Sequence, residues 1–79
     1  MKLLYFAQTR TAAGVTEETV AVASPLDETS LWQRLVERHP ALAPLRANTR
    51  LARNGAFTSP GELFDDADEV ALIPPVSGG

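Results

Sequence analysis

The sequence contains no cysteine, few aromatic residues and no long apolar run. The absence of cysteine excludes a disulfide framework, a thiolate zinc site and a cysteine nucleophile in this chain. The apolar run near the N-terminus stops at Gln8 after five residues, which is too short for a secretory signal. No stretch approaches the roughly 20 apolar residues of a membrane helix. We therefore expect a soluble cytoplasmic protein without a membrane partner.

The chain also lacks an excess of positive charge, because it has seven basic and ten acidic residues and a net charge of −3. Binding to nucleic acid needs a clustered positive surface, so nucleic acid is not the expected partner. No nucleophile-base pair or metal-ligand cluster is recognisable in the sequence. We expect no metal site, and we expect a carrier or a subunit of an enzyme rather than an enzyme acting alone.

What is present suits one small domain spanning residues 1–79, since 44% of the residues are hydrophobic and 22% are charged. Residues 3–7 are apolar and aromatic, which predicts a strand with Phe6 on the same side as Lys2. Residues 9–17 have the composition of a loop, and residues 18–23 predict a second strand. The two strands would form a hairpin.

An amphipathic helix is predicted next, with Asp27 as its N-cap and an end near His39, because Pro40 disfavours helix in the residue before it. We expect His39 to cap this helix or to complement its dipole rather than to bind metal. Residues 41–45 add at most a short helical turn.

The C-terminal half predicts three strands, at residues 49–54, 56–58 and 69–73. Asn54-Gly55 is a strong hairpin signal because both residues tolerate positive φ. The acidic residues between positions 62 and 69 are interpreted as a solvated turn, and Arg46, Arg50 and Arg53 as a solvated face. The element order predicts an α+β fold of the ubiquitin-like β-grasp type, a mixed sheet of four to five strands crossed by one main helix.

The last six residues, 74–79, are predicted to form a flexible tail. Two prolines cannot continue the ladder of the preceding strand, so the chain leaves the sheet there. Gly78 and Gly79 have no Cβ and can thread where a larger residue would collide. The carboxylate of Gly79 is then the exposed functional group.

The sequence resembles the small subunit of molybdopterin synthase, the MoaD-like sulfur carriers, over essentially its whole length. The matching residues are Phe6-Ala7 with Arg10, Leu31-Trp32 with Leu35 and His39-Pro40, Asn54-Gly55, and Asp68-Glu69-Val70-Ala71 followed by Pro74-Pro75-Val76-Ser77-Gly78-Gly79. The tail is the most specific part of this match. One departure is Ala67, where the family usually has glycine, so a turn that needed positive φ would be strained or rebuilt there.

The resemblance implies that an E1-like (MoeB-like) enzyme uses ATP to adenylate Gly79, and that an external sulfur donor converts the adenylate to a thiocarboxylate. The tail residues Pro75, Val76, Ser77 and Gly78 would then enter the large (MoaE-like) synthase subunit, where the thiocarboxylate gives its sulfur to a pterin precursor. No cofactor is expected on this chain. An ionised carboxylate is a poor electrophile, which agrees with a need for activation.

The resemblance also implies an apolar docking patch at Phe6, Phe57 and Ile73, with Arg10 as a further contact. The alternative is that these apolar residues belong to the core, where large apolar side chains usually lie. Three rival functions remain open: a ThiS-like or other sulfur carrier for a different product, a ubiquitin-like protein modifier joined through Gly79, and a binding module with an inert tail.

Overall fold

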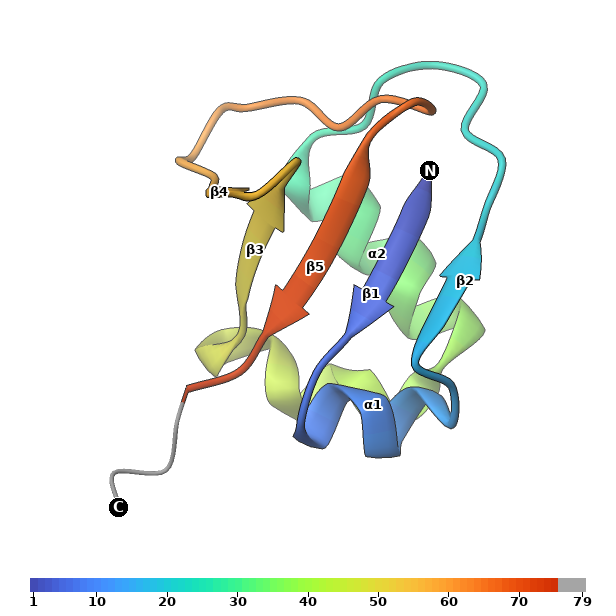
Figure 1. The fold of residues 1–79 in the computed structure, drawn as a ribbon, viewed down its shortest axis with the longest axis vertical. Coiled ribbons are helices and arrows are strands. Elements are labelled where there is room, and N and C mark those ends of the chain that lie inside the picture. Colours follow the sequence, from blue (N-terminus) through green and yellow to red (C-terminus); the bar gives the residue numbers. More distant parts are fainter. Residues whose placement is uncertain (76–79) are drawn as a thin grey trace.

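The computed structural model describes residues 1–75, and in this part of the chain five strands form one sheet. The strands are β1 (Lys2–Tyr5), β2 (Glu17–Thr19), β3 (Arg50–Arg53), β4 (Ala56–Phe57) and β5 (Glu69–Ile73). Their order across the sheet is β2-β1-β5-β3-β4, and only β1 and β5 run parallel. The predicted mixed sheet is confirmed, and its first and last strands lie side by side at its centre (Figure 1).

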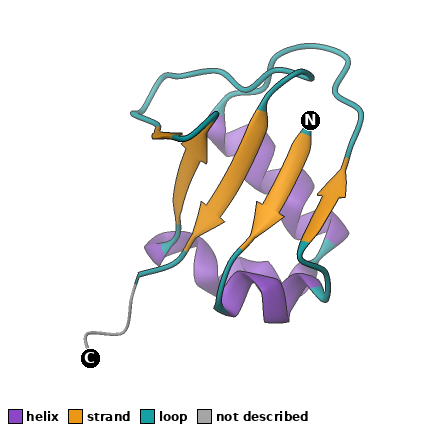
Figure 2. Cartoon of the chain, viewed as in Figure 1, coloured by secondary structure: helices purple, strands orange, loops and turns teal. Residues whose placement is uncertain are grey.

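Helices cover one face of the sheet and leave the other open (Figure 2). The main helix α2 (Glu28–Arg38) crosses behind the strands, and the shorter α1 (Gln8–Ala13) and the 3₁₀ helix η1 (Pro40–Asn48) lie at one end. This is the α+β arrangement that the sequence predicts. Within residues 1–75, no helix combines the length and the apolar character needed to span a membrane.

The core lies between the sheet and α2. Period-two alternation directs Leu3, Tyr5, Val70 and Leu72 toward the helix, and each is almost fully buried. The other buried apolar residues are Met1, Val22, Leu31, Trp32, Leu35, Leu42, Leu51, Ala52 and Phe64. Burial of this set is the main stabilising contribution that a domain of this size can make.

Helix α2 begins and ends where the sequence predicts. Asp27 caps its N-terminus, since one carboxylate oxygen accepts a hydrogen bond of 2.7 Å from the Ser30 N–H. This bond lowers the pKa of Asp27, which is consistent with an anion at the positive end of a helix. The C-terminal cap is His39, just before Pro40.

The segment after β1 is a helix, so the predicted loop over residues 9–17 is wrong in its first half. Helix α1 ends at Gly14, whose φ of 77° is the left-handed conformation that glycine favours at helix ends. Ala12 and Ala13 pack against the core, which gives the helix its tertiary support. Gly14 was interpreted as a loop residue because a helix this short has too few apolar positions to show a periodicity.

The remaining boundaries differ from expectation by a few residues. Strand β1 ends at Tyr5 and β2 at Thr19, so the first hairpin is shorter than predicted. The short turn expected at residues 41–45 is the longer η1. The Asn54-Gly55 hairpin is confirmed, with φ of 51° and 89° at the two residues. Ala67 is not among the residues with positive φ, so the predicted strain there is absent.

Candidate functional site

A strip of four side chains crosses the open face of the sheet at the end where β5 finishes. Phe6 and Phe57 are 47% and 51% exposed, and Ile73 between them is half-buried. Tyr5 pairs with Leu72, so the next residues along the two strands, Phe6 and Ile73, also lie next to each other. The docking strip, as we call Phe6, Ile73, Arg50 and Phe57, thus contains the three apolar residues named from the sequence.

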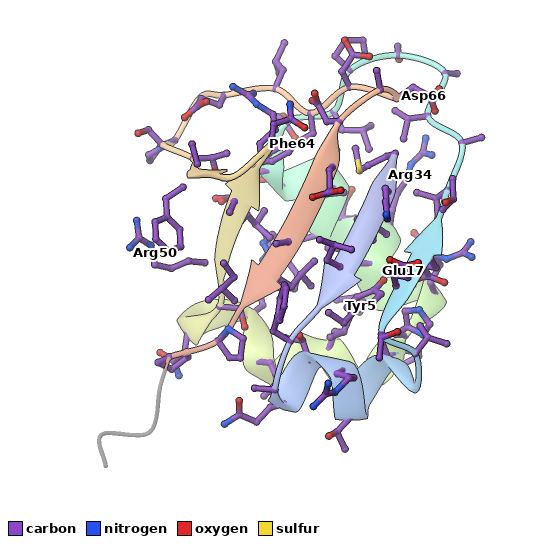
Figure 3. The ribbon with its side chains drawn as sticks, viewed as in Figure 1. Tyr5, Glu17, Arg34, Arg50, Phe64 and Asp66 are labelled. Atoms are coloured by element: carbon purple, nitrogen blue, oxygen red, sulfur yellow. The ribbon has the colours of Figure 1, made fainter. Side chains whose placement is uncertain are left out.

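Arg50 is the member of the strip that sequence reasoning missed. It pairs with Ile73 across β3 and β5, and its guanidinium carbon lies 3.8 Å from the centre of the Phe57 ring. Figure 3 shows Arg50 projecting beside β3. A cation stacked on an aromatic ring is a common contact at protein interfaces. Arg50 is two residues from Ala52, so the two side chains lie on the same face of β3. Once the pairing of β3 with β4 is known, this spacing places Arg50 on the outer face of the sheet.

Phe6 is held outward by a tight turn immediately after β1. The Thr9 N–H donates to the Phe6 carbonyl at 3.0 Å, and the Thr9 hydroxyl accepts from the Phe6 N–H at 2.9 Å. Thr9 is fully buried, and its hydroxyl lies 2.6 Å from the Phe6 carbonyl and 3.3 Å from that of Leu72. One buried side chain therefore ties the backbone of Phe6 to Leu72, near the end of β5.

Ala7 adopts an unusual backbone conformation in this turn, with φ of 49° and ψ of −125°. Its Cβ disfavours this region, and such residues cost about 1–3 kcal/mol. We expect Ala7→Gly to raise the free energy of unfolding by about 1 kcal/mol, because relief of strain exceeds the added entropy of glycine. Thermal denaturation measures this, as a melting temperature higher by roughly 4–8 °C.

Ala47→Gly is the matched control for this prediction. Ala47 is exposed, lies in η1 and is not among the residues with positive φ, so glycine there should lower stability by about 0.5–1 kcal/mol. Equal losses in both variants would contradict the assignment of strain to Ala7.

The end of β5 sets the direction in which the chain leaves the domain. Pro74 is buried and Pro75 is exposed, so the chain passes from the core to the surface between these two residues. The other tail residues named from the sequence, Val76, Ser77, Gly78 and Gly79, lie outside the described residues.

Arg10 is exposed on α1, with its N–H bonded to the Ala7 carbonyl at 3.0 Å, one turn beyond Phe6. Its proposed role as a docking contact stays a prediction.

A cluster of polar side chains joins β2 to the end of α2. The Glu18 carboxylate accepts a hydrogen bond of 2.6 Å from the Tyr5 hydroxyl and lies 2.7 Å from Nε2 of His39. Arg38 is paired with the same carboxylate at 3.3 Å. The prediction that His39 caps α2 is confirmed, but the hydrogen bond between its ring and Glu18 was not foreseen, since the two residues are 21 positions apart.

This cluster makes stability depend on pH in the acid range. Partial burial alone would raise the pKa of Glu18, but the hydrogen bonds from Tyr5, His39 and Arg38 outweigh it and lower the pKa to about 2. A depressed pKa means that the contribution is complete above the ordinary value near 4.5 and is lost as pH falls toward 2. We expect the stability difference between wild type and Glu18→Gln to shrink across this interval.

Urea denaturation at about pH 7 and about pH 3 measures that difference. The other carboxylates are present in both proteins, so their pH dependence cancels when the two are compared. Asp66 and Asp68 also have lowered pKa values, mainly from hydrogen bonds to Val22 and Asn54. A difference that is the same at both pH values would refute the role of Glu18.

The acidic loop before β5 is more than a solvated turn. Asp66 accepts a 2.9 Å hydrogen bond from the Val22 N–H and pairs with the N-terminal ammonium. Asp68 accepts from the Asn54 side chain, and Glu62 pairs with Arg53. Among residues 1–75, no three histidine or carboxylate side chains gather into a group that could hold a metal ion. These carboxylates anchor the loop to its neighbours.

The described residues thus define a ubiquitin-like β-grasp domain, with the exposed side chains of Phe6, Arg50 and Phe57 near the end of β5. A sequence profile of the ThiS family matches residues 3–79. The chain belongs to this family. The resemblance to the molybdopterin synthase small subunit is also confirmed by curated relatives.

Two of these relatives bear the name molybdopterin synthase sulfur carrier subunit. The protein from Chlamydomonas reinhardtii is 38% identical over 100% of this chain and 98% of its own length. The human protein is 34% identical over 100% of this chain and 93% of its own.

Solved structures show the same fold. SAMP1, the small archaeal modifier protein 1 of Haloferax volcanii, superimposes with a TM-score of 0.83 at 32% identity, covering 100% of this chain and 98% of that one. A complex of subunits 1 and 2 of the Helicobacter pylori molybdopterin-converting factor contains a chain with a TM-score of 0.67 at 18% identity. This match covers 99% of our chain and 96% of that chain, and at this identity it bears on the fold alone.

Proposed function

We propose that this protein is the sulfur carrier subunit of a molybdopterin synthase and acts in the biosynthesis of the molybdenum cofactor. The observation that carries the proposal is full-length similarity to relatives of that name, together with Gly78 and Gly79, which four residues separate from Ile73 of the docking strip. The alternative within the ThiS family is a carrier for a different sulfur-accepting product, but the two curated relatives described above share the molybdopterin name.

The chemistry would take place at the carboxylate of Gly79. That group is ionised at neutral pH and must be activated before sulfur can replace oxygen. An E1-like enzyme would transfer AMP from ATP to the carboxylate, and an external sulfur donor would displace the AMP to leave a thiocarboxylate. The chain has no cysteine, so the sulfur must come from outside it.

The docking strip would position the tail against its partners. Apolar and aromatic residues with an arginine, exposed beside the point where the chain leaves the sheet, are the composition of an interface core. The large synthase subunit and the activating enzyme would both need access to the tail, so they would bind the strip in turn. Binding at the strip places Gly79 in a site without this chain supplying any catalytic group.

The test is the intact mass of the protein after incubation with ATP, an activating enzyme and a sulfur donor. We expect the mass to rise by the difference between one sulfur and one oxygen atom, only when all three are present. Addition of the large subunit and a pterin precursor should then yield the dithiolene product and return the carrier to its starting mass. No change of mass would overturn the carrier assignment, and a thiocarboxylate without pterin product would overturn the molybdopterin assignment.

The second candidate is a protein modifier, which the similarity to the Haloferax modifier favours. A modifier forms an amide between Gly79 and a lysine of another protein, whereas a carrier returns as a free chain. Denaturing gels of cell extracts distinguish the two, because conjugates survive denaturation as species of higher mass. Their absence in cells that contain the activating enzyme would remove this candidate.

A further inference from the structure

Lys2 is the only lysine in the sequence, and the other basic residues counted with it are all arginine. The two side chains differ in chemistry, because a lysine amine can lose its proton and attack an acyl group, whereas an arginine guanidinium stays protonated. An activated carboxylate at Gly79 would react with amines as well as with sulfur nucleophiles. The places of lysine and arginine relative to the tail therefore decide whether the chain can acylate itself.

Arg50 is the basic residue beside the start of the tail. It pairs with Ile73, the last residue of β5. Paired residues of antiparallel strands have Cα atoms about 5 Å apart, and an extended chain gains at most about 3.6 Å per residue. Residues 74–79 are therefore long enough to bring the Gly79 carboxylate to a side chain at position 50. Groups joined by so short a linker meet at an effective concentration on the order of millimolar.

The contact with Phe57 accounts for a cation at position 50. The guanidinium carbon of Arg50 lies 3.8 Å from the centre of the Phe57 ring. A lysine ammonium is attracted to an aromatic face in the same way, although the planar guanidinium stacks more closely. The requirement for positive charge at this place could thus be met by either side chain, but only lysine would bring a nucleophilic amine to the tail.

Lys2 lies at the other end of the sheet. It pairs with Glu69, the first residue of β5, because β1 and β5 run parallel (Figure 1). The four residues from Glu69 to Ile73, at roughly 3.3 Å each, place Lys2 about 13 Å from the start of the tail. The Lys2 ammonium lies 3.5 Å from Glu17 and 4.0 Å from Glu69, so it must leave both carboxylates before it can attack an acyl group.

The amino group of Met1 is also engaged. It donates a hydrogen bond of 2.7 Å to the Val20 carbonyl and lies 3.4 Å from the Asp66 carboxylate. Met1 is almost fully buried and precedes Lys2, at the end of the sheet away from the tail. An acyl group on the tail would reach this nitrogen only after these contacts had broken.

We propose that Arg50 is a specificity-determining residue, which keeps a positive charge beside the tail without an amine that an activated Gly79 would acylate. An unprotonated amine at position 50 would attack the carbonyl carbon of Gly79. The bond from that carbon to the leaving group would break, AMP would depart with the electron pair, and the nitrogen would release a proton to water. The resulting internal amide would end the use of the tail as a carrier. With arginine at this position the acyl group stays available to the sulfur donor, and the inference rests on the activation of Gly79 proposed above.

A thioester at Gly79 tests this reactivity without an activating enzyme. The full chain is made as an intein fusion and released with a small thiol, which leaves the thioester at its C-terminus. We expect the wild-type thioester to hydrolyse to the free carboxylate. The Arg50→Lys thioester should instead lose its thiol to the new amine, giving an internal amide that is lighter than the hydrolysed chain by one water molecule. Intact mass should show an amide fraction at least about tenfold larger than in the wild type.

Two further variants locate the amide. Arg34→Lys makes the same change on α2, where Arg34 lines a groove with Thr19 of β2, and β2 is three places from β3 in the sheet. We expect its thioester to hydrolyse as the wild type does. Arg50→Lys combined with Lys2→Arg should still form the amide, and fragment masses after proteolysis should join position 50 to Gly79. Circular dichroism checks that each variant keeps the fold.

Three results would overturn the inference: an Arg50→Lys thioester that only hydrolyses, a wild-type thioester that closes on Lys2 at a comparable rate, and equal closure in Arg34→Lys. Incubation of the same variants with ATP and the activating enzyme separates this inference from the carrier function, because pyrophosphate release reports adenylation. Release without an amide in Arg50→Lys contradicts the inference and leaves the carrier function intact. Absence of release contradicts the carrier function, while the thioester result still decides the role of position 50.

Discussion

Deletion of Gly79 should lower sulfur transfer by at least about a hundredfold in a reaction reconstituted with the activating enzyme, the sulfur donor and the large subunit. The shortened chain still ends in a carboxylate, but that group sits about 3.5 Å nearer the domain. Displacement of a reacting group by only about 1 Å can cost a hundredfold in rate. Product formation per minute under single-turnover conditions is the measurement.

Ser77→Ala is the matched control for the deletion, because it alters the tail but keeps its length. We expect this variant to retain most of its activity, and both proteins to melt at the wild-type temperature. Activity of the shortened chain within about tenfold of wild type would refute the view that reach, fixed by the last glycine, governs transfer.

Phe6→Asp should weaken binding of the large subunit by about 2–4 kcal/mol, which is roughly a thirtyfold to thousandfold change in Kd. The change places a charge within the proposed apolar contact, where it must be desolvated without a partner. Phe6 is 47% exposed in the free protein, so the folded state should tolerate the substitution. Isothermal titration measures Kd, and circular dichroism measures the fold.

Leu63→Asp is the control for Phe6→Asp. Leu63 is 52% exposed, and its loop between β4 and β5 does not include the docking strip. The same loss of affinity in both variants would mean that added negative charge, rather than the strip, causes the effect. Unfolding of Phe6→Asp would instead assign Phe6 to the core.

The sequence predicts those parts of the fold that depend on local signals. Asp27 and Pro40 delimit α2, Asn54-Gly55 produces a hairpin, and alternation in residues 69–73 orients β5 as expected. Helix α1 was missed because its support comes from distant parts of the chain: Thr9 is held near Leu72, and Ala12 packs on the core. Such support leaves no periodic pattern within six residues.

The candidate site likewise contains some residues that sequence patterns identify and some contacts that they do not. Phe6 and Ile73 could be named because each shares the outer face of its strand with a charged residue, whereas Phe57 was named from the family resemblance alone. Arg50 could be named only as part of a solvated face, since its place over Phe57 depends on the register between β3 and β4. The contacts of Glu18 with His39 and of Asp66 with Val22 likewise join residues that only the folded chain brings together.

The central position of β5 also bears on how the protein is made. β5 lies between β1 and β3, so a nascent chain that lacks residues 69–73 has neither of the two strand pairings that join the halves of the sheet. Those pairings join strands that are far apart in the sequence, so they can form only when translation is nearly complete. Gly79, where we propose that the chemistry takes place, follows β5 in the sequence and is therefore synthesised only after the strand that finishes the domain. Under the function proposed above, an incomplete chain would therefore offer an activating enzyme no Gly79.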